Sequence, residues 1–262
     1  MIILALLQCV LAVSHIICLL SEIPNAVILV IGVKIRRDIC YRIVAPYIFF
    51  GCIQTLVMLL LVIDIYVVVY LPTVYRTMPN KKYLCFMLIL PCIYGITTVT
   101  SGFLTTNEEI LNVCNPPLAL YPTISLAFSR SLLVFNTITV LCFLILIIIF
   151  SLQKQKKESR RIMKRLRISV IVFTFSWYMC VLGVGFVADI GLTPGTVEIL
   201  QSNMVVFALL SYSQTFFVML WKSSEYRDAF LELWSCLPLL KKYKSAMKPA
   251  SSLQNVTIVR SR

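Results

Sequence analysis

Six apolar stretches of the sequence are each long enough to cross a bilayer, which takes about 20 residues of helix. Apolar residues make up 60% of the 262 residues and charged residues 13%, whereas a soluble domain is about 45–50% apolar and about 25% charged. The sequence therefore predicts an all-α membrane protein, a bundle of six transmembrane helices without a large extramembrane catalytic domain. A shorter apolar run, 24–33, is expected to be interfacial or to extend the first helix. The six stretches cover residues 1–20, 43–71, 84–104, 117–152, 168–190 and 197–221.

Lys and Arg are distributed unevenly among the connecting segments. Nineteen lie after the second span, after the fourth span or beyond Trp221, and four lie between the first and second spans. Because cytoplasmic segments carry the excess of positive charge, both termini are predicted to be cytoplasmic, in the plasma membrane. The expected environment is a bilayer with an anionic inner leaflet, and nucleic acid is not expected as a partner. The exceptions to this rule are Lys34, Arg36, Arg37 and Arg42, which would lie outside.

Two of the ten cysteines would lie on the outer, oxidising side of the membrane. Cys40 stands at the outer mouth of the second span, and Cys114 lies in the loop between the third and fourth spans. A disulfide can persist there, and one between these residues would tie a helix end to the loop above it. Two free thiols are the alternative. No Cys-x-x-Cys pair is present, so neither a metal site nor a cofactor is expected.

The second span ends in a distinctive triplet. Asp64-Ile65-Tyr66 comes 24 residues after Cys40, and a helix of that length rises about 36 Å. The cysteine and the triplet therefore lie at opposite faces of the bilayer. This arrangement resembles the third helix of G-protein-coupled receptors, which carries an outer disulfide cysteine and an inner DRY-type triplet.

Further motifs narrow the resemblance to one class. They are Tyr75-Arg76-Thr77, Cys114-Asn115-Pro116-Pro117, Ser211-Tyr212-Ser213-Gln214 and the stretch from Trp221 to Phe230. In order and spacing they are similar to the Srsx class of nematode serpentine chemoreceptors. The resemblance implies a receptor fold, a small-molecule ligand on the outer side, a heterotrimeric G protein on the inner side and no enzymatic activity.

The sequence departs from the family pattern in its inner half. The family has seven helices, and the span with Cys40 is its third but the second here, so the bundle resembles helices two to seven. Ile65 replaces the Arg of the triplet, and Thr-Phe-Phe-Val-Met at 215–219 replaces an NPxxY-like motif. These changes predict weak or absent G-protein activation, because Ile cannot supply a planar cation.

Four residues are candidates for contacting the ligand. Tyr47 and Gln54 lie two and four turns below Cys40, at the depth where this class lines its ligand site; interhelical packing is the alternative. Arg130 would pair with an acidic ligand or another buried group, or would snorkel to the outer interface. Trp177 would gate or fill the floor of the site, and no Pro follows it to form the usual kink.

His15, in the first span, is expected to be a neutral imidazole hydrogen-bonded to a neighbouring helix. A transporter or channel is an alternative function, but the paired charges or repeats it predicts are not visible. A second alternative is a truncated receptor that does not signal.

The inner face is predicted to be basic. Residues 153–167 carry eight cations that would meet the G protein or, without a special partner, anionic lipid. A short amphipathic helix is expected at 223–235, with Tyr226, Phe230 and Leu233 on one face and Cys236 as a palmitoylation site. This helix belongs to the transmembrane bundle, which is predicted to cover residues 1–240. A flexible basic cytoplasmic tail is predicted at 241–262.

Six residues are predicted to face the G protein. They are Asp64, Ile65, Tyr66, Arg160, Arg161 and Lys164. For Asp64 the alternative is a remnant acid that is solvated at the helix end.

Overall fold

A computed structural model describes most of the apolar part of the chain. The chain divides into two compact units, Met1–Thr215 and Phe216–Arg262, which are described separately. The described residues are 2–152, 174–189, 196, 200, 203, 206–213, 216–217, 220 and 224–234.

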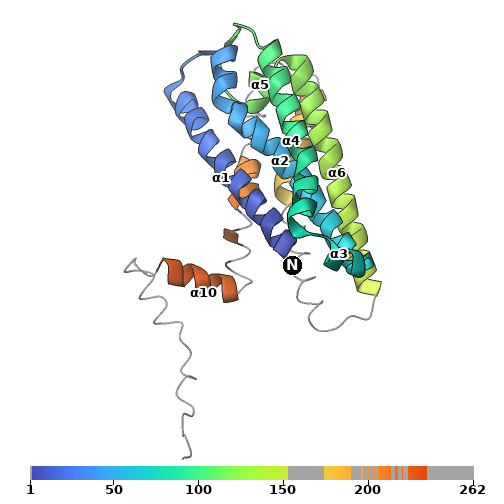
Figure 1. The fold of residues 1–262 in the computed structure, drawn as a ribbon. Coiled ribbons are helices and arrows are strands. Elements are labelled where there is room, and N and C mark those ends of the chain that lie inside the picture. Colours follow the sequence, from blue (N-terminus) through green and yellow to red (C-terminus); the bar gives the residue numbers. More distant parts are fainter. Residues whose placement is uncertain are drawn as a thin grey trace, which may run out of the picture. The chain divides into compact units, whose positions relative to one another are not determined.

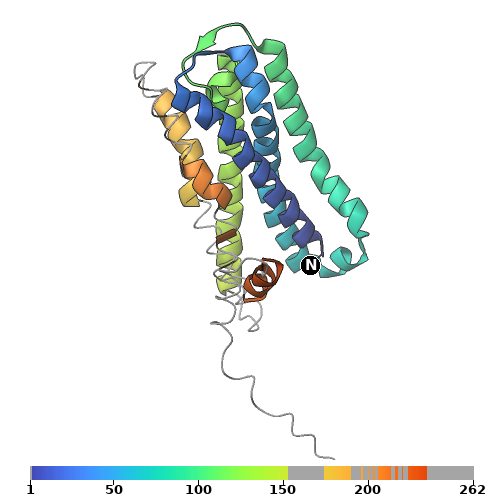
Figure 2. The same cartoon turned by 90° about the vertical axis from the view of Figure 1, so that its left-hand side faces the viewer.

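The first unit is a helical bundle with two very short strands at one end (Figures 1 and 2). Its elements are α1 (Ile2–Ile31), β1 (Ile35–Arg36), α2 (Arg37–Tyr70), α3 (Pro72–Thr77), α4 (Asn80–Thr105), β2 (Ile110–Leu111), α5 (Pro116–Ala119), α6 (Pro122–Leu152), the π-helical segment η1 (Thr174–Tyr178) and α8 (Met179–Asp189). The second unit contains α10 (Ser224–Leu233).

Four helices of the described chain are long and apolar enough to cross a membrane. They correspond to the first four predicted spans; the fifth and sixth fall on residues that are described only in part, so six helices are not confirmed. The four candidate spans are Leu6–Ile28, Arg37–Tyr70, Lys81–Thr105 and Pro122–Ile149.

Several predicted boundaries differ from the structure, among them the start of the second span, which was predicted at 43 whereas α2 begins at Arg37. The run 24–33 is an extension of the first helix, since α1 continues through Pro24 to Ile31; the carbonyl group freed by a proline can be satisfied by neighbours within a bundle. The fourth span begins at Pro122 rather than at 117. The residues before it form the separate turn α5, which the side chain of Asn115 caps by accepting a hydrogen bond from the Leu118 backbone nitrogen (3.0 Å).

Helix α2 is the central element of the first unit. It packs against α1, α4, α5 and α6. In its most apolar stretch 56% of the residues are buried, compared with 17% in the corresponding stretch of α4. Large apolar side chains on the other helices point outward, for example Phe86 and Leu104 of α4. Such side chains suit contact with lipid, because hydrocarbon tails are as apolar as the side chains themselves.

Two glycines of α4 allow it to approach α2 closely. A Cβ atom at Gly102 would overlap the ring of Tyr41, and one at Gly95 would come within 2.8 Å of the Phe49 ring. Tyr41 is fully buried, and its hydroxyl donates a hydrogen bond to the Val99 carbonyl oxygen (2.9 Å). Small residues at such crossings are a common way of packing helices in membranes.

We expect Gly102→Ala to destabilise the bundle by about 1–3 kcal/mol, because the added methyl group must displace Tyr41 from a well-packed position. The thermal unfolding midpoint of the purified protein in detergent measures the effect. Gly51→Ala is the matched control, since a Cβ atom at Gly51 meets nothing within 4 Å. Equal midpoints for the two variants would contradict the packing argument.

Candidate functional site

A disulfide closes the end of the bundle that is predicted to lie outside, which we call the outer end. Cys40 near the start of α2 is bonded to Cys114 in the loop before α5, with their Cα atoms 5.6 Å apart. Both residues are buried. The predicted pairing is therefore confirmed, and the alternative of two free thiols is wrong.

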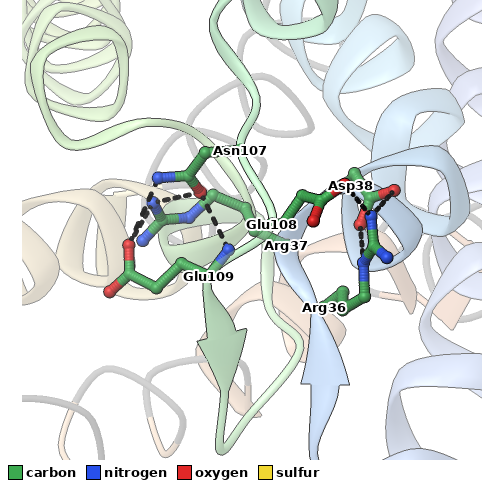
Figure 3. A network of polar contacts seen from close by, with 6 residues as sticks. All are labelled: Arg36, Arg37, Asp38, Asn107, Glu108 and Glu109. Atoms are coloured by element: carbon green, nitrogen blue, oxygen red, sulfur yellow. Dashed lines mark hydrogen bonds and ion pairs between the residues drawn. The ribbon is translucent and has the colours of Figure 1, made fainter.

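The two short strands bring acids next to the outer cations (Figure 3). β1 pairs with β2 in antiparallel register, with Arg36 opposite Ile110. Arg36 forms ion pairs with Asp38 (3.0 Å) and Glu108 (2.8 Å). The hydrogen bond with Asp38 raises the pKa of Arg36 above its ordinary value, so this residue is a permanent cation held by two carboxylates.

Arg37, the next residue, is buried, whereas Arg36 is exposed. Arg37 also makes more polar contacts than Arg36. Its Nη1 donates to the carboxylate of Glu109 (2.7 Å) and to the side-chain oxygen of Asn107 (3.0 Å), and its Nε donates to the Leu118 carbonyl (3.2 Å). Two of the four cations predicted to violate the charge rule are thus neutralised by acids of the same outer segments.

A buried cluster of polar and aromatic side chains lies on α1, α2, η1 and residues 206–213. We call it the Tyr212 cluster; it comprises His15, Cys18, Glu22, Asn25, Tyr47, Gln54, Trp177 and Tyr212, each at most 9% exposed.

Tyr212 connects the helices of this cluster. Its hydroxyl donates a hydrogen bond to the hydroxyl of Tyr47 (2.7 Å). Its ring centroid lies 5.4 Å from that of His15 and 5.6 Å from that of Trp177. Gln54 is a further polar neighbour of the Tyr212 hydroxyl. One side chain from the C-terminal part of the unit thus contacts three other elements.

Several polar atoms of the Tyr212 cluster have no hydrogen-bond partner in the described structure. They are Glu22 Oε1, Asn25 Oδ1, Gln54 Oε1 and Trp177 Nε1. Buried polar groups in folded proteins are nearly always paired, and an unpaired one costs about 1–3 kcal/mol. Three unpaired acceptors and one donor in a single cluster are the arrangement expected where a polar ligand completes the bonding.

The structure brings together three of the four predicted ligand contacts. Tyr47, Gln54 and Trp177 belong to the Tyr212 cluster. Arg130 does not: its side chain is exposed on α6, as the snorkelling alternative requires. His15 contacts the ring of Tyr212, where a hydrogen bond to a neighbouring helix was predicted.

Sequence reasoning missed Glu22 and Asn25 as parts of the site. The first span was predicted to end at residue 20, which left both outside it. The signal was present, since Leu11, Cys18, Glu22 and Asn25 recur at helical spacing, and all four are buried on one face of α1. Tyr212 was quoted only as part of a family motif.

At the inner end of α2, the predicted triplet has mixed exposure. Asp64 is fully buried, so it is neither solvated at the helix end nor exposed to a protein partner. Its polar neighbours include the hydroxyls of Tyr75 and Tyr83. Burial of Tyr75 raises the pKa of its hydroxyl, and the negative charge of Asp64 adds a smaller effect in the same direction. Tyr66 donates a hydrogen bond to the Cys142 carbonyl of α6 (2.8 Å), and Ile65 is half-buried.

The predicted amphipathic helix corresponds to α10 of the second unit. Phe230 packs between the rings of Phe216 (5.4 Å) and Trp234 (6.1 Å). Leu233, predicted on the same face, is 77% exposed, and Leu231 is the buried leucine. The basic segment 153–167, with Arg160, Arg161 and Lys164, lies outside the described residues, as do Cys236, the tail 241–262 and most of 215–219.

Apolar spans, a disulfide and an acid at the far end of the disulfide-bearing helix are features that the chain shares with serpentine receptors. The chain belongs to the serpentine type 7TM GPCR chemoreceptor Srsx family, whose sequence model matches residues 2–234. No individually curated protein matches the sequence. The family assignment makes the chain a multi-pass membrane protein of a receptor family rather than of an enzyme family.

We expect Cys40→Ala and Cys114→Ala each to lower the free energy of unfolding by about 2–4 kcal/mol, because the loop between them is no longer closed. The double variant should lose no more than either single one, since one substitution already removes the bond. Thermal unfolding in detergent measures this, with Cys9→Ala as a control at an exposed free thiol. Additive losses in the double variant would contradict the pairing.

Proposed function

We propose that the protein is a chemosensory receptor that binds a small organic molecule at the Tyr212 cluster and transmits binding as a change in helix packing. The observation that carries the proposal is the set of unpaired buried polar atoms around Tyr212. These atoms lie on α1, α2 and η1, so a ligand that pairs with them changes the energy of holding these elements together.

The depth of the cluster supports this role. Tyr47 lies seven residues below Cys40 on α2, or about 10 Å along a helix, and Gln54 lies about 21 Å below it. A ligand entering from the disulfide-bonded end therefore meets Tyr47 first. Because the disulfide and the Arg37 contacts fix the outer end of α2, ligand binding acts on a helix that is anchored above the site.

The segment with Trp177 supports a conformational role. It is π-helical from Thr174 to Tyr178, at the place where the family's kink-forming proline is missing. Single π-helical turns occur frequently at functional sites and bend helices without a proline. Trp177 thus joins the ring of Tyr212 to a backbone segment with irregular hydrogen bonding.

Orientation and partners complete the proposal. We propose that the protein lies in the plasma membrane with both termini on the cytoplasmic side. The anionic inner leaflet would then face the basic segment 153–167. The orientation rests on the 19 Lys and Arg residues assigned to the inner side against four on the outer side. A heterotrimeric G protein is the proposed inner partner, and coupling is proposed to be weak because Ile65 provides no cation.

Ligand binding is tested by the thermal midpoint of the purified protein in nanodiscs against a panel of small organic alcohols, ketones, acids and amines. At least one compound should raise the midpoint. Tyr212→Phe should raise the Kd of that compound about fivefold, because the substitution removes the hydroxyl that orders Tyr47 and one hydrogen bond is worth about 1 kcal/mol.

Tyr121→Phe is the matched control for this experiment, since Tyr121 is 41% exposed and outside the cluster. If the compound stabilises the Tyr212→Phe and Tyr121→Phe variants equally, binding at the cluster is contradicted. No stabilisation by any compound would contradict the receptor proposal.

Signalling is tested separately by nucleotide exchange on a heterotrimeric G protein in membranes that contain the chain. We expect little ligand-dependent exchange from the unmodified chain and an increase with Ile65→Arg. Ile65→Lys is the control, because it adds the same charge without the planar donor fork of Arg. Strong exchange by the unmodified chain would show that Ile65 does not limit coupling.

A further inference from the structure

Glu22 is an acidic side chain inside the bundle whose bonding is incomplete. It lies on the buried face of α1 and is 9% exposed. One carboxylate oxygen accepts a hydrogen bond from the Asn25 side-chain nitrogen (3.2 Å). The other oxygen, Glu22 Oε1, has no partner in the described structure, and neither has Asn25 Oδ1.

The surroundings of Glu22 contain polar groups and rings but no cation among the described residues. Cys18, Tyr47 and Cys180 lie close enough for their electrostatics to depend on Glu22. The ion pairs in the described part of the chain all involve Arg36 or Arg37.

A buried carboxyl group without a cation is expensive to keep ionised, so it is either protonated or paired with a positive charge. An ammonium group provides that charge together with hydrogen-bond donors, and it has no acceptor of its own. Three of the four unpaired atoms match it, since Glu22 Oε1 and Asn25 Oδ1 are both acceptors and Gln54 adds a third acceptor to the cluster, whereas Trp177 Nε1 is a donor. An anionic ligand would instead add a second negative charge beside Glu22.

The aromatic part of the cluster suits the rest of such a ligand. Tyr47, Trp177 and His15 surround Tyr212 at centroid distances of 5.4–6.2 Å. Aromatic faces attract cations by about 0.5–2 kcal/mol and pack well against apolar or aromatic groups.

We propose that the ligand of the Tyr212 cluster is a protonated amine with an apolar or aromatic body, and that Glu22 is the residue that pairs with its charge. This inference rests on the proposed function, because it names the chemical class that the receptor binds. Arg130, the residue that would have favoured an acidic ligand, stands outside the cluster.

The test compares matched compounds that differ in one group. Butylamine, hexylamine, 2-phenylethylamine and tryptamine are each measured beside the alcohol and the carboxylic acid of the same skeleton, as the shift in thermal midpoint of the full chain in nanodiscs. At least one amine should stabilise the wild type by more than its alcohol and acid. Its Kd should rise at least tenfold in Glu22→Gln and less in Glu22→Asp, which retains the charge.

Two readouts separate ligand binding from a structural role of Glu22. Without ligand, Glu22→Gln should unfold at the same or a higher temperature, because a neutral isostere is easier to bury. Glu232→Gln removes an exposed carboxylate of α10 and should leave the amine response unchanged. An equal amine response in Glu22→Gln and the wild type would overturn the proposal.

The outcomes also distinguish this inference from the function on which it rests. Stabilisation by alcohols or acids, with none by amines, would overturn the amine assignment while retaining a ligand-binding receptor. No stabilisation by any compound of the series or of the wider panel would overturn both proposals.

Discussion

The burial of α2 is the constraint on which the rest of the described structure depends. The other three described helices that are long enough to span a membrane, α1, α4 and α6, all pack against it, and the end predicted to be outer is fixed by the Cys40–Cys114 bond. Because α2 carries Tyr47 and Gln54 in its outer part and Asp64 in its inner part, the candidate ligand site and the inner triplet share one rigid element. A change in packing at Tyr47 therefore acts on the helix that also holds Asp64.

Much of this architecture could be predicted from the sequence because bilayer thickness imposes a minimum length on apolar helices. The four described spans were predicted, and so was the disulfide, since only two cysteines lay on the outer side. The boundaries were less accurate for a physical reason. Hydropathy falls at Glu22 and Pro24, where α1 nevertheless continues, because a polar side chain on the inner face of a bundle need not end a helix. The strand pair of 35–36 with 110–111 joins segments too short to carry any pattern.

The candidate site was predictable only in part. Depth along one helix predicted that Tyr47 and Gln54 lie in one region of the bundle, because a helix fixes the rise per residue, and both belong to the Tyr212 cluster. Arg130 was placed by the same measure, but depth gives no direction around the helix axis, and its side chain is on the exposed face. Tyr212 could not be placed from the sequence, since its contacts with His15, Tyr47 and Trp177 join residues up to 197 positions apart.

Glu22 and Asp64 show why identical chemistry has different consequences at the two ends of the bundle. Both carboxyl groups are buried, and neither has an ion pair among the described residues. Asp64 has the hydroxyls of Tyr75 and Tyr83 as neighbours, and the Tyr83 hydroxyl is the nearer source of a donor from within the protein. The thiols near Glu22 are weak donors; Cys18 donates to the Tyr47 carbonyl oxygen (3.9 Å), and the Cys180 sulfur accepts from the Ala208 backbone. The described residues thus provide a hydroxyl beside Asp64 but no cation beside Glu22, which is why we propose the outer cluster, rather than the inner triplet, as the place for a cationic ligand.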